Sequence, residues 1–175
     1  MKPDSRDSED RLISALHLNA WDARIIGWCA RNGITLMRVA MGSVFFWFGA
    51  LKYFPGLSPA ENLAGQTILK VTSGRLLPAS SLPILATWEC AIGLGLLSGR
   101  LPRLTLLLLF GQMMGTMLPL FFFPAEMWTH IPYAPTMAGQ YIIKNVVFVT
   151  AAIVVGATAR GARLVSQARP PRTGK

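Results

Sequence analysis

Apolar residues dominate four long stretches of the chain, and shorter polar or charged segments separate them. Each stretch is close to the ~20 residues that an α-helix needs to cross a hydrocarbon core of about 30 Å. The pattern therefore predicts an all-α protein whose four transmembrane helices form a bundle. We expect spans at about residues 33–54, 81–98, 104–123 and 140–158, within a membrane domain of residues 32–159.

The chain before the first span has a different, amphipathic pattern. In residues 11–31 the apolar side chains fall broadly on one side of a helix and the charged side chains fall on others. Such a helix tends to lie in the headgroup plane of a membrane; packing against a soluble partner protein is the alternative. Residues 1–31 are thus expected to form a cytoplasmic polar terminus and an interfacial helix. Residues 160–175 are basic and are expected to form a cytoplasmic tail.

The segment between the first two spans predicts one further helix. Ser58, Pro59, Ala60 and Glu61 have the form of a capping box with proline at the first helical position. A short helix through about Val71 is expected to follow. We expect this helix to close the extracytoplasmic mouth of the bundle.

One face of the first span carries its glycines and both of its charges. Arg38, Gly42, Phe45, Gly49 and Lys52 follow helical spacing, so they share that face. The two glycines permit close contact with a neighbouring helix. The guanidinium of Arg38 is expected to extend to the cytoplasmic headgroups.

Composition and charge agree with a membrane protein. The chain is 52% hydrophobic and 14% charged, well below the ~25% of charged residues usual in soluble domains. The net charge of +9 could indicate nucleic-acid binding, but the basic residues flank the apolar spans, where the positive-inside rule expects them. The prediction is a multi-pass plasma-membrane protein with both termini cytoplasmic, in contact with the lipid bilayer and not with nucleic acid.

Few residues are suited to catalysis or metal binding. The chain has two cysteines, Cys29 and Cys90, and two histidines, His17 and His130, none at a spacing typical of a metal or haem site. No nucleophile triad, phosphate loop or dinucleotide-binding glycine pattern is present. The catalytic residues are therefore unknown, and a self-contained enzyme is not predicted.

Three intramembrane charges form the candidate site. Lys52, Glu89 and Lys144 are expected at similar depth in the outer half of the bundle, with Gln140 and Asn145 nearby. One carboxylate between two ammonium groups would form a pocket of net positive character. Such a pocket can bind a small anion or a carbonyl group, as in a quinone headgroup, and Glu89 could relay a proton. The alternative is a structural ion pair that fixes helix register.

Three runs of sequence resemble a known family. They are RVAMGSVFFWFGALKYFPGLSPA, WECAIGLGLLSGRLPRLTLLL and GQYIIKNVVFVTAAIVVGATARG. They are similar to the DoxX-like superfamily of bacterial four-helix membrane proteins and to a sister family that includes a reactive-chlorine-stress membrane protein. The resemblance covers residues 33–163, and Gly49, Lys52, Glu89 and Lys144 mark it.

The resemblance implies a four-helix fold in the bacterial plasma membrane. Some relatives are subunits of a thiosulfate:quinone oxidoreductase, and others partner soluble enzymes of oxidative-stress defence. The expectation is an accessory subunit of a membrane redox or stress-defence system, with quinone as a candidate ligand and a soluble or membrane redox partner. A scaffold that anchors a partner protein is the alternative, and a transporter is less favoured because no internal repeat is evident. A GxxxG pair, Gly111 and Gly115, leaves homo-oligomerisation open.

Overall fold

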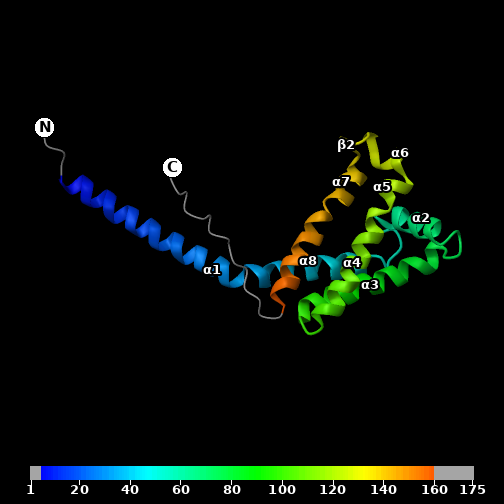
Figure 1. The fold of residues 1–175 in the computed structure, drawn as a ribbon, viewed down its shortest axis with the longest axis horizontal. Coiled ribbons are helices and arrows are strands. Elements are labelled where there is room, and N and C mark those ends of the chain that lie inside the picture. Colours follow the sequence, from blue (N-terminus) through cyan, green and yellow to red (C-terminus); the bar gives the residue numbers. More distant parts are fainter. Residues whose placement is uncertain (1–4, 160–175) are drawn as a thin grey trace, which may run out of the picture. The chain divides into compact units, whose positions relative to one another are not determined.

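The computed structural model describes the backbone of residues 5–159 and the side chains of residues 19–159, so the predicted basic tail lies outside the described residues. This part of the chain is mostly helical (Figure 1). Four of its helical segments are long and apolar enough to cross a membrane, as the sequence predicts: Asn19–Leu51, Pro78–Ser98, Pro102–Phe122 and Met137–Thr158. Two compact units, residues 1–36 and 37–175, divide within the first helix.

The first helix, α1 (Ser5–Leu51), is continuous. We predicted a break between an interfacial helix ending at residue 31 and a span beginning at residue 33, and the structure has none. The side chain of Asn32 donates a hydrogen bond to the carbonyl of Trp28, one turn earlier, at 2.9 Å. Asn32 is thereby accommodated within the helix, and Gly33 lowers helix propensity by only about 1 kcal/mol. The helix therefore continues through residues 31–33, where the sequence predicted a helix boundary.

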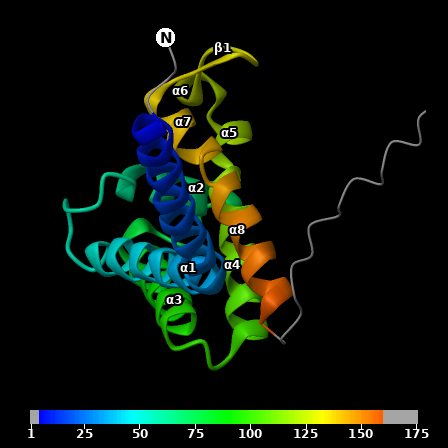
Figure 2. The same cartoon turned by 90° about the vertical axis from the view of Figure 1, so that its left-hand side faces the viewer.

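Close glycine contacts join the second part of α1 to α3 (Pro78–Ser98) (Figure 2). A Cβ added at Gly93 would lie 2.5 Å from the backbone nitrogen of Phe46, and one at Gly49 would lie 2.9 Å from that of Cys90. A Cβ at Gly42 would lie 2.9 Å from the side chain of Leu97. Only a hydrogen atom fits at these three positions, which confirms the predicted role of Gly42 and Gly49.

The third span packs against α3, and the fourth span packs against the third. α3 ends at Gly99 in the left-handed conformation (φ 65°), and α4 (Pro102–Met117) follows after a short turn. Pro119 begins a separate helix, α5 (Pro119–Phe122), so the third span is interrupted there. The fourth span consists of α7 (Met137–Ile143) and α8 (Val146–Thr158), and α8 lies beside α4 (Figure 2). The buried core comprises Met41, Phe45, Ile92, Leu96, Leu109, Met113 and Ala152.

The predicted short helix is present as α2 (Glu61–Val71), but the predicted capping box is wrong. Ala60 is the N-cap residue, and no side chain caps the helix. The carboxylate of Glu61 instead accepts a hydrogen bond from the backbone of Gly56 at 2.7 Å, so this side chain holds the preceding turn. α2 packs on the start of α3, and Lys70 donates to the carbonyl of Phe122 at 2.9 Å.

A small β-hairpin modifies the predicted all-α fold. The chain after α6 (Pro124–Met127) forms β1 (Trp128–His130), which pairs antiparallel with β2 (Ala134–Pro135). Thr136 stabilises the connection between the hairpin and α7 (Met137–Ile143). Its hydroxyl donates to the carbonyl of Glu126 at 2.7 Å and accepts from the backbone of Gly139 at 3.2 Å, which caps α7. The hairpin lies in the proline-rich segment between the third and fourth spans.

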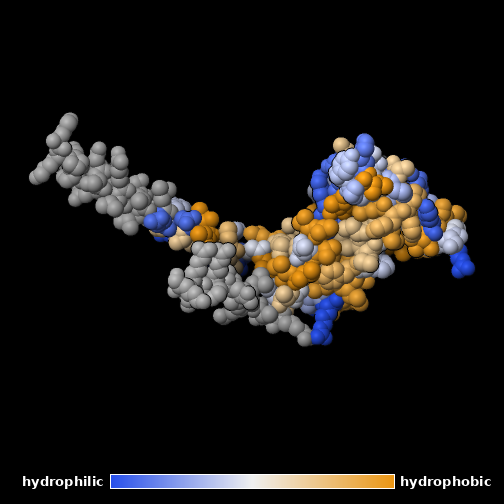
Figure 3. Space-filling model, turned by 45° about the horizontal axis from the view of Figure 1, so that its top comes forward, coloured by the Kyte–Doolittle hydropathy of each residue, from blue (hydrophilic) through white to orange (hydrophobic). Residues whose placement is uncertain are grey.

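The face of the bundle seen in Figure 3 is hydrophobic over a wide area. Large apolar side chains such as Leu107, Met114 and Val147 are exposed on the predicted spans. Soluble monomers rarely expose contiguous apolar surface of this kind. These faces are suited to contact with lipid.

Arg38, which we expected to extend to the cytoplasmic headgroups, binds the end of α3. Its Nη1 donates to the carbonyl oxygen of Leu96 at 2.8 Å. The last carbonyls of a helix lack intrahelical partners and carry a partial negative charge, which a guanidinium neutralises. Gly99 leaves room for this contact, because a Cβ there would overlap the Arg38 guanidinium.

Replacing Arg38 with methionine is expected to destabilise the bundle by about 1.5–3 kcal/mol, the usual range for a hydrogen bond to a charged group. Arg103→Met is the matched control, because Arg103 is exposed and no hydrogen bond from its side chain is recorded within residues 19–159. Unfolding midpoints in mixed detergent micelles measure the difference. Equal midpoints for the two variants would show that the Arg38–Leu96 contact contributes no stability.

Candidate functional site

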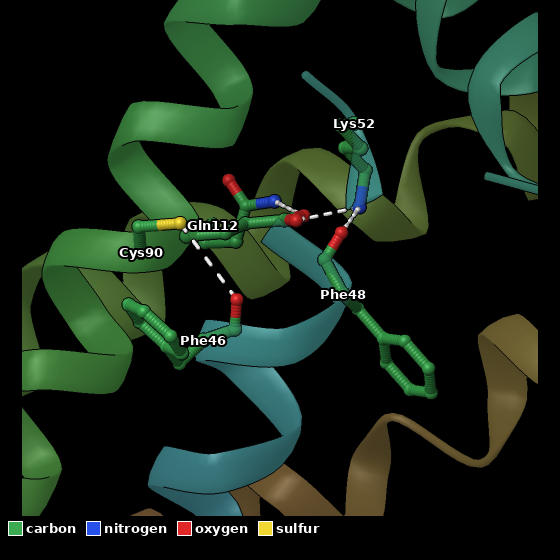
Figure 4. A network of polar contacts seen from close by, with 6 residues as sticks. Phe46, Phe48, Lys52, Cys90 and Gln112 are labelled. Carbon is green, nitrogen blue, oxygen red and sulfur yellow. Dashed lines mark hydrogen bonds and ion pairs between the residues drawn. The ribbon is translucent and has the colours of Figure 1, made fainter. Parts of the chain in front are cut away.

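Three polar side chains meet inside the bundle (Figure 4). The ammonium of Lys52 lies 2.5 Å from the Oε2 of Glu89. The side-chain amide of Gln112 donates to the Oε1 of the same carboxylate at 2.8 Å. Lys52 also donates to the carbonyl of Phe48 at 3.3 Å, at the end of α1. We call Lys52, Glu89 and Gln112 the polar network.

Each member of the polar network comes from a different span. Lys52 is the first residue after α1, Glu89 lies near the middle of α3, and Gln112 lies near the middle of α4. Gly49 lets α1 approach α3 closely enough for the Lys52 side chain to reach the carboxylate. The network therefore links three helices at one level of the bundle.

Glu89 lies deeper than we expected. α3 begins at Pro78, three residues before the predicted start of this span, because proline is favoured in the first helical turn. Glu89 follows Pro78 by eleven residues, or about 16 Å along the helix. This places its backbone near the centre of the span and not in its outer half.

The pairing offsets the cost of placing charge inside a membrane. Glu89 is 8% exposed, and the side chain of Lys52 is 7% exposed. A charge at a bilayer centre costs about 2.5–3.5 kcal/mol on insertion scales. Opposite charges at ~4 Å gain up to about 4 kcal/mol at an effective dielectric of 20. Both carboxylate oxygens of Glu89 have a partner, so the network is stable as an ion pair with a supporting hydrogen bond.

Counting bonds among residues 19–159, the polar network retains N–H groups that have no hydrogen-bond acceptor. A lysine ammonium has three N–H donors, and Lys52 uses two, for Phe48 and Glu89. The Gln112 amide uses one of its two N–H groups in the bond to Glu89. The network can therefore donate further hydrogen bonds, and its formal charge is zero. A neutral carbonyl ligand fits this arrangement better than an anion does.

The other predicted site residues are not part of this network. Lys144 joins α7 to α8, is exposed, and places its ammonium 5.3 Å from the centre of the Tyr141 ring. Within residues 19–159, no ion pair or hydrogen bond is recorded between Lys144 and Glu89. Gln140 lies one turn before Lys144 and is exposed. Asn145 directly follows Lys144 and is half-buried. The prediction that the Glu89 carboxylate lies between two ammonium groups is therefore wrong. Two residues at similar depth meet only if their helices are rotated so that the two side chains face each other.

Gln112 is the residue that we did not assign to the site. The sequence does show that Gln112 shares a face of its span with Thr105, Leu108 and Thr116. A buried carboxylate needs a partner for each oxygen, and one lysine provides a partner for one. A search of the polar faces of the neighbouring spans for a second donor would have identified Gln112.

Comparisons of this chain with protein-family models, curated proteins and solved structures give no significant match. The resemblance to DoxX-like proteins therefore depends on the sequence motifs alone. The polar network and its surroundings are the features of the structure that bear on function.

Proposed function

We propose that this protein is a DoxX-like accessory subunit of a membrane redox or oxidative-stress system, and that its polar network binds a quinone-like ligand. The observation that supports this proposal is the Lys52–Glu89–Gln112 network itself, in a largely apolar bundle. Ionisable groups within a membrane are costly and usually mark a binding site or proton path.

The chemistry of the network matches a quinone headgroup. The free N–H groups of Lys52 and Gln112 can donate to a quinone carbonyl, and the ligand can enter from the lipid through the apolar faces. Reduction of a quinone to a quinol takes up two electrons and two protons. In this proposal a partner redox protein supplies the two electrons and water supplies the two protons. Lys52 donates a proton to the quinone, and Glu89 relays protons from water to Lys52.

The distribution of charge supports an orientation in the bacterial plasma membrane. Nearly all loop arginines and lysines lie in the N-terminal segment, the turn around Arg100 and Arg103, and the C-terminal tail. The positive-inside rule then assigns both termini to the cytoplasm and α2 to the other side. The amphipathic part of residues 11–31 would lie at the cytoplasmic headgroups.

A structural scaffold is the second candidate, and one observation favours it. Both oxygens of Glu89 already have protein partners, so the network needs no ligand to be satisfied. A buried ion pair of this kind can serve to fix the register of three helices. In that case the protein would anchor a partner and carry no ligand.

Native mass spectrometry with lipid extraction of mildly solubilised protein tests the proposal. We expect a co-purifying quinone in the wild type and its loss in Glu89→Gln, which keeps the size of the side chain and removes its charge. Lys144→Gln is the matched control and should retain the ligand, because Lys144 lies outside the network. Wild-type protein without any quinone, or equal loss in both variants, would refute the proposed site.

A further inference from the structure

A short motif is repeated on the N-terminal part of α1. Trp21-Asp22-Ala23-Arg24 is followed after seven residues by Trp28-Cys29-Ala30-Arg31. Seven residues correspond to about two helical turns, so the two tryptophans share one face, and so do the two arginines. The function proposed above does not use this repeat.

The structure places the repeat on an open surface. Trp21, Arg24, Ile25, Trp28 and Arg31 line a shallow hollow along the helix. Trp21 is 62% exposed, and Trp28 is 51% exposed. The guanidinium of Arg24 lies 5.7 Å from the centre of the Trp21 ring, within the range of a cation–π interaction. We call these five residues the Trp–Arg stripe.

The side chains of the Trp–Arg stripe match the chemistry of a phospholipid headgroup. Guanidinium groups bind phosphate oxygens through two parallel hydrogen bonds, and indole rings favour the boundary between water and lipid. Arg31 lies two residues before the predicted span, and Trp28 lies five residues before it, or within about 8 Å along the helix. The C-terminal half of the stripe is thus near the level at which headgroups are found.

We propose that the Trp–Arg stripe binds anionic phospholipids through their headgroups. The proposal depends on the membrane location argued above, but not on the polar network or its ligand. Charge favours lipid over a second copy of this chain. A symmetric pairing of two stripes would bring four arginines together, and the stripe contains no acidic residue to compensate. Asp22 lies about 100° around the helix from Trp21, outside the stripe.

Native mass spectrometry of the full-length protein in detergent, titrated with dioleoylphosphatidylglycerol or dioleoylphosphatidylcholine, tests this proposal. We expect the wild type to bind the anionic lipid more tightly than the zwitterionic one. Arg24→Gln/Arg31→Gln should weaken binding of the anionic lipid on the order of tenfold, because both bidentate guanidinium–phosphate contacts beside the two indole rings are lost. Arg100→Gln/Arg103→Gln removes the same charge from another exposed site and is the control, expected to keep most of the affinity.

Two results would overturn the proposal. Equal loss of lipid in both double variants would show that only net charge matters. A dimer mass that disappears in Trp21→Ala/Trp28→Ala, together with equal binding of the two lipids, would assign the stripe to self-association. Neither result would affect retention of a quinone at the polar network, so the two proposals fail independently.

Discussion

Replacing Lys52 alone with methionine is expected to destabilise the bundle more than replacing Lys52 and Glu89 together. The single change leaves the Glu89 carboxylate buried without its cation, and breaking a buried pair in this way costs about 3–5 kcal/mol. The double variant, Lys52→Met with Glu89→Gln, removes both charges. Its stability should be closer to that of the wild type, because neutral groups of similar size often replace a buried ion pair at little cost.

A double-mutant cycle measured by unfolding in mixed detergent micelles checks this expectation. Lys144→Met is the control, since the ammonium of Lys144 is exposed and lies over the Tyr141 ring. We expect that control to change stability by much less than Lys52→Met. Additive effects of the Lys52 and Glu89 changes would contradict the structure, because residues in one ion pair should couple.

The second large effect is expected at Gly93. A methyl group there would lie 2.5 Å from the backbone nitrogen of Phe46 and 2.7 Å from its Cα, and backbone atoms of a packed helix cannot easily move aside. Gly93→Ala should therefore separate α1 from α3 and cost roughly 1–3 kcal/mol, as overpacked cores do. The polar network should weaken as well, because it joins the same two helices.

Gly115→Ala is the matched control for Gly93→Ala. Both glycines lie inside spans, but a Cβ at Gly115 meets no atom within 4 Å. Alanine should be neutral there, or stabilising by up to about 1 kcal/mol through helix propensity. If Gly115→Ala were the more harmful change, the Gly111–Gly115 pair would have a partner outside this chain.

The four long apolar helices and the closely packed face of the first could be predicted from the sequence, because hydrophobic length and glycine spacing determine them directly. The same face of α1 that carries Gly42 and Gly49 does pack closely on α3. Pro119 does interrupt the third span. In each of these cases a local physical requirement is sufficient: the length of a span, space for a close contact, or the missing N–H of proline.

The composition of the site could be predicted only in part, because it depends on how each helix is rotated about its axis. Lys52 and Glu89 do meet, as expected for opposite charges in an apolar bundle. Lys144 has a similar predicted depth, but it lies on an exposed side of its helix. Gln112 reaches Glu89 because α4 turns its polar face toward α3, and an amphipathic pattern does not specify the neighbouring helix. The Glu61 side chain can likewise accept from more than one backbone N–H group. It accepts from Gly56 and does not form the predicted capping box.

The most direct test of the proposed function is the binding of a short-chain quinone to the purified full-length protein, with the unfolding midpoint measured on the same samples. The wild type should bind the quinone. The double variant Lys52→Met/Glu89→Gln should keep a similar midpoint but bind at least tenfold more weakly. A double variant that binds the quinone as the wild type does, or a wild type that does not bind it, would contradict a ligand site at the polar network and leave that network a structural ion pair.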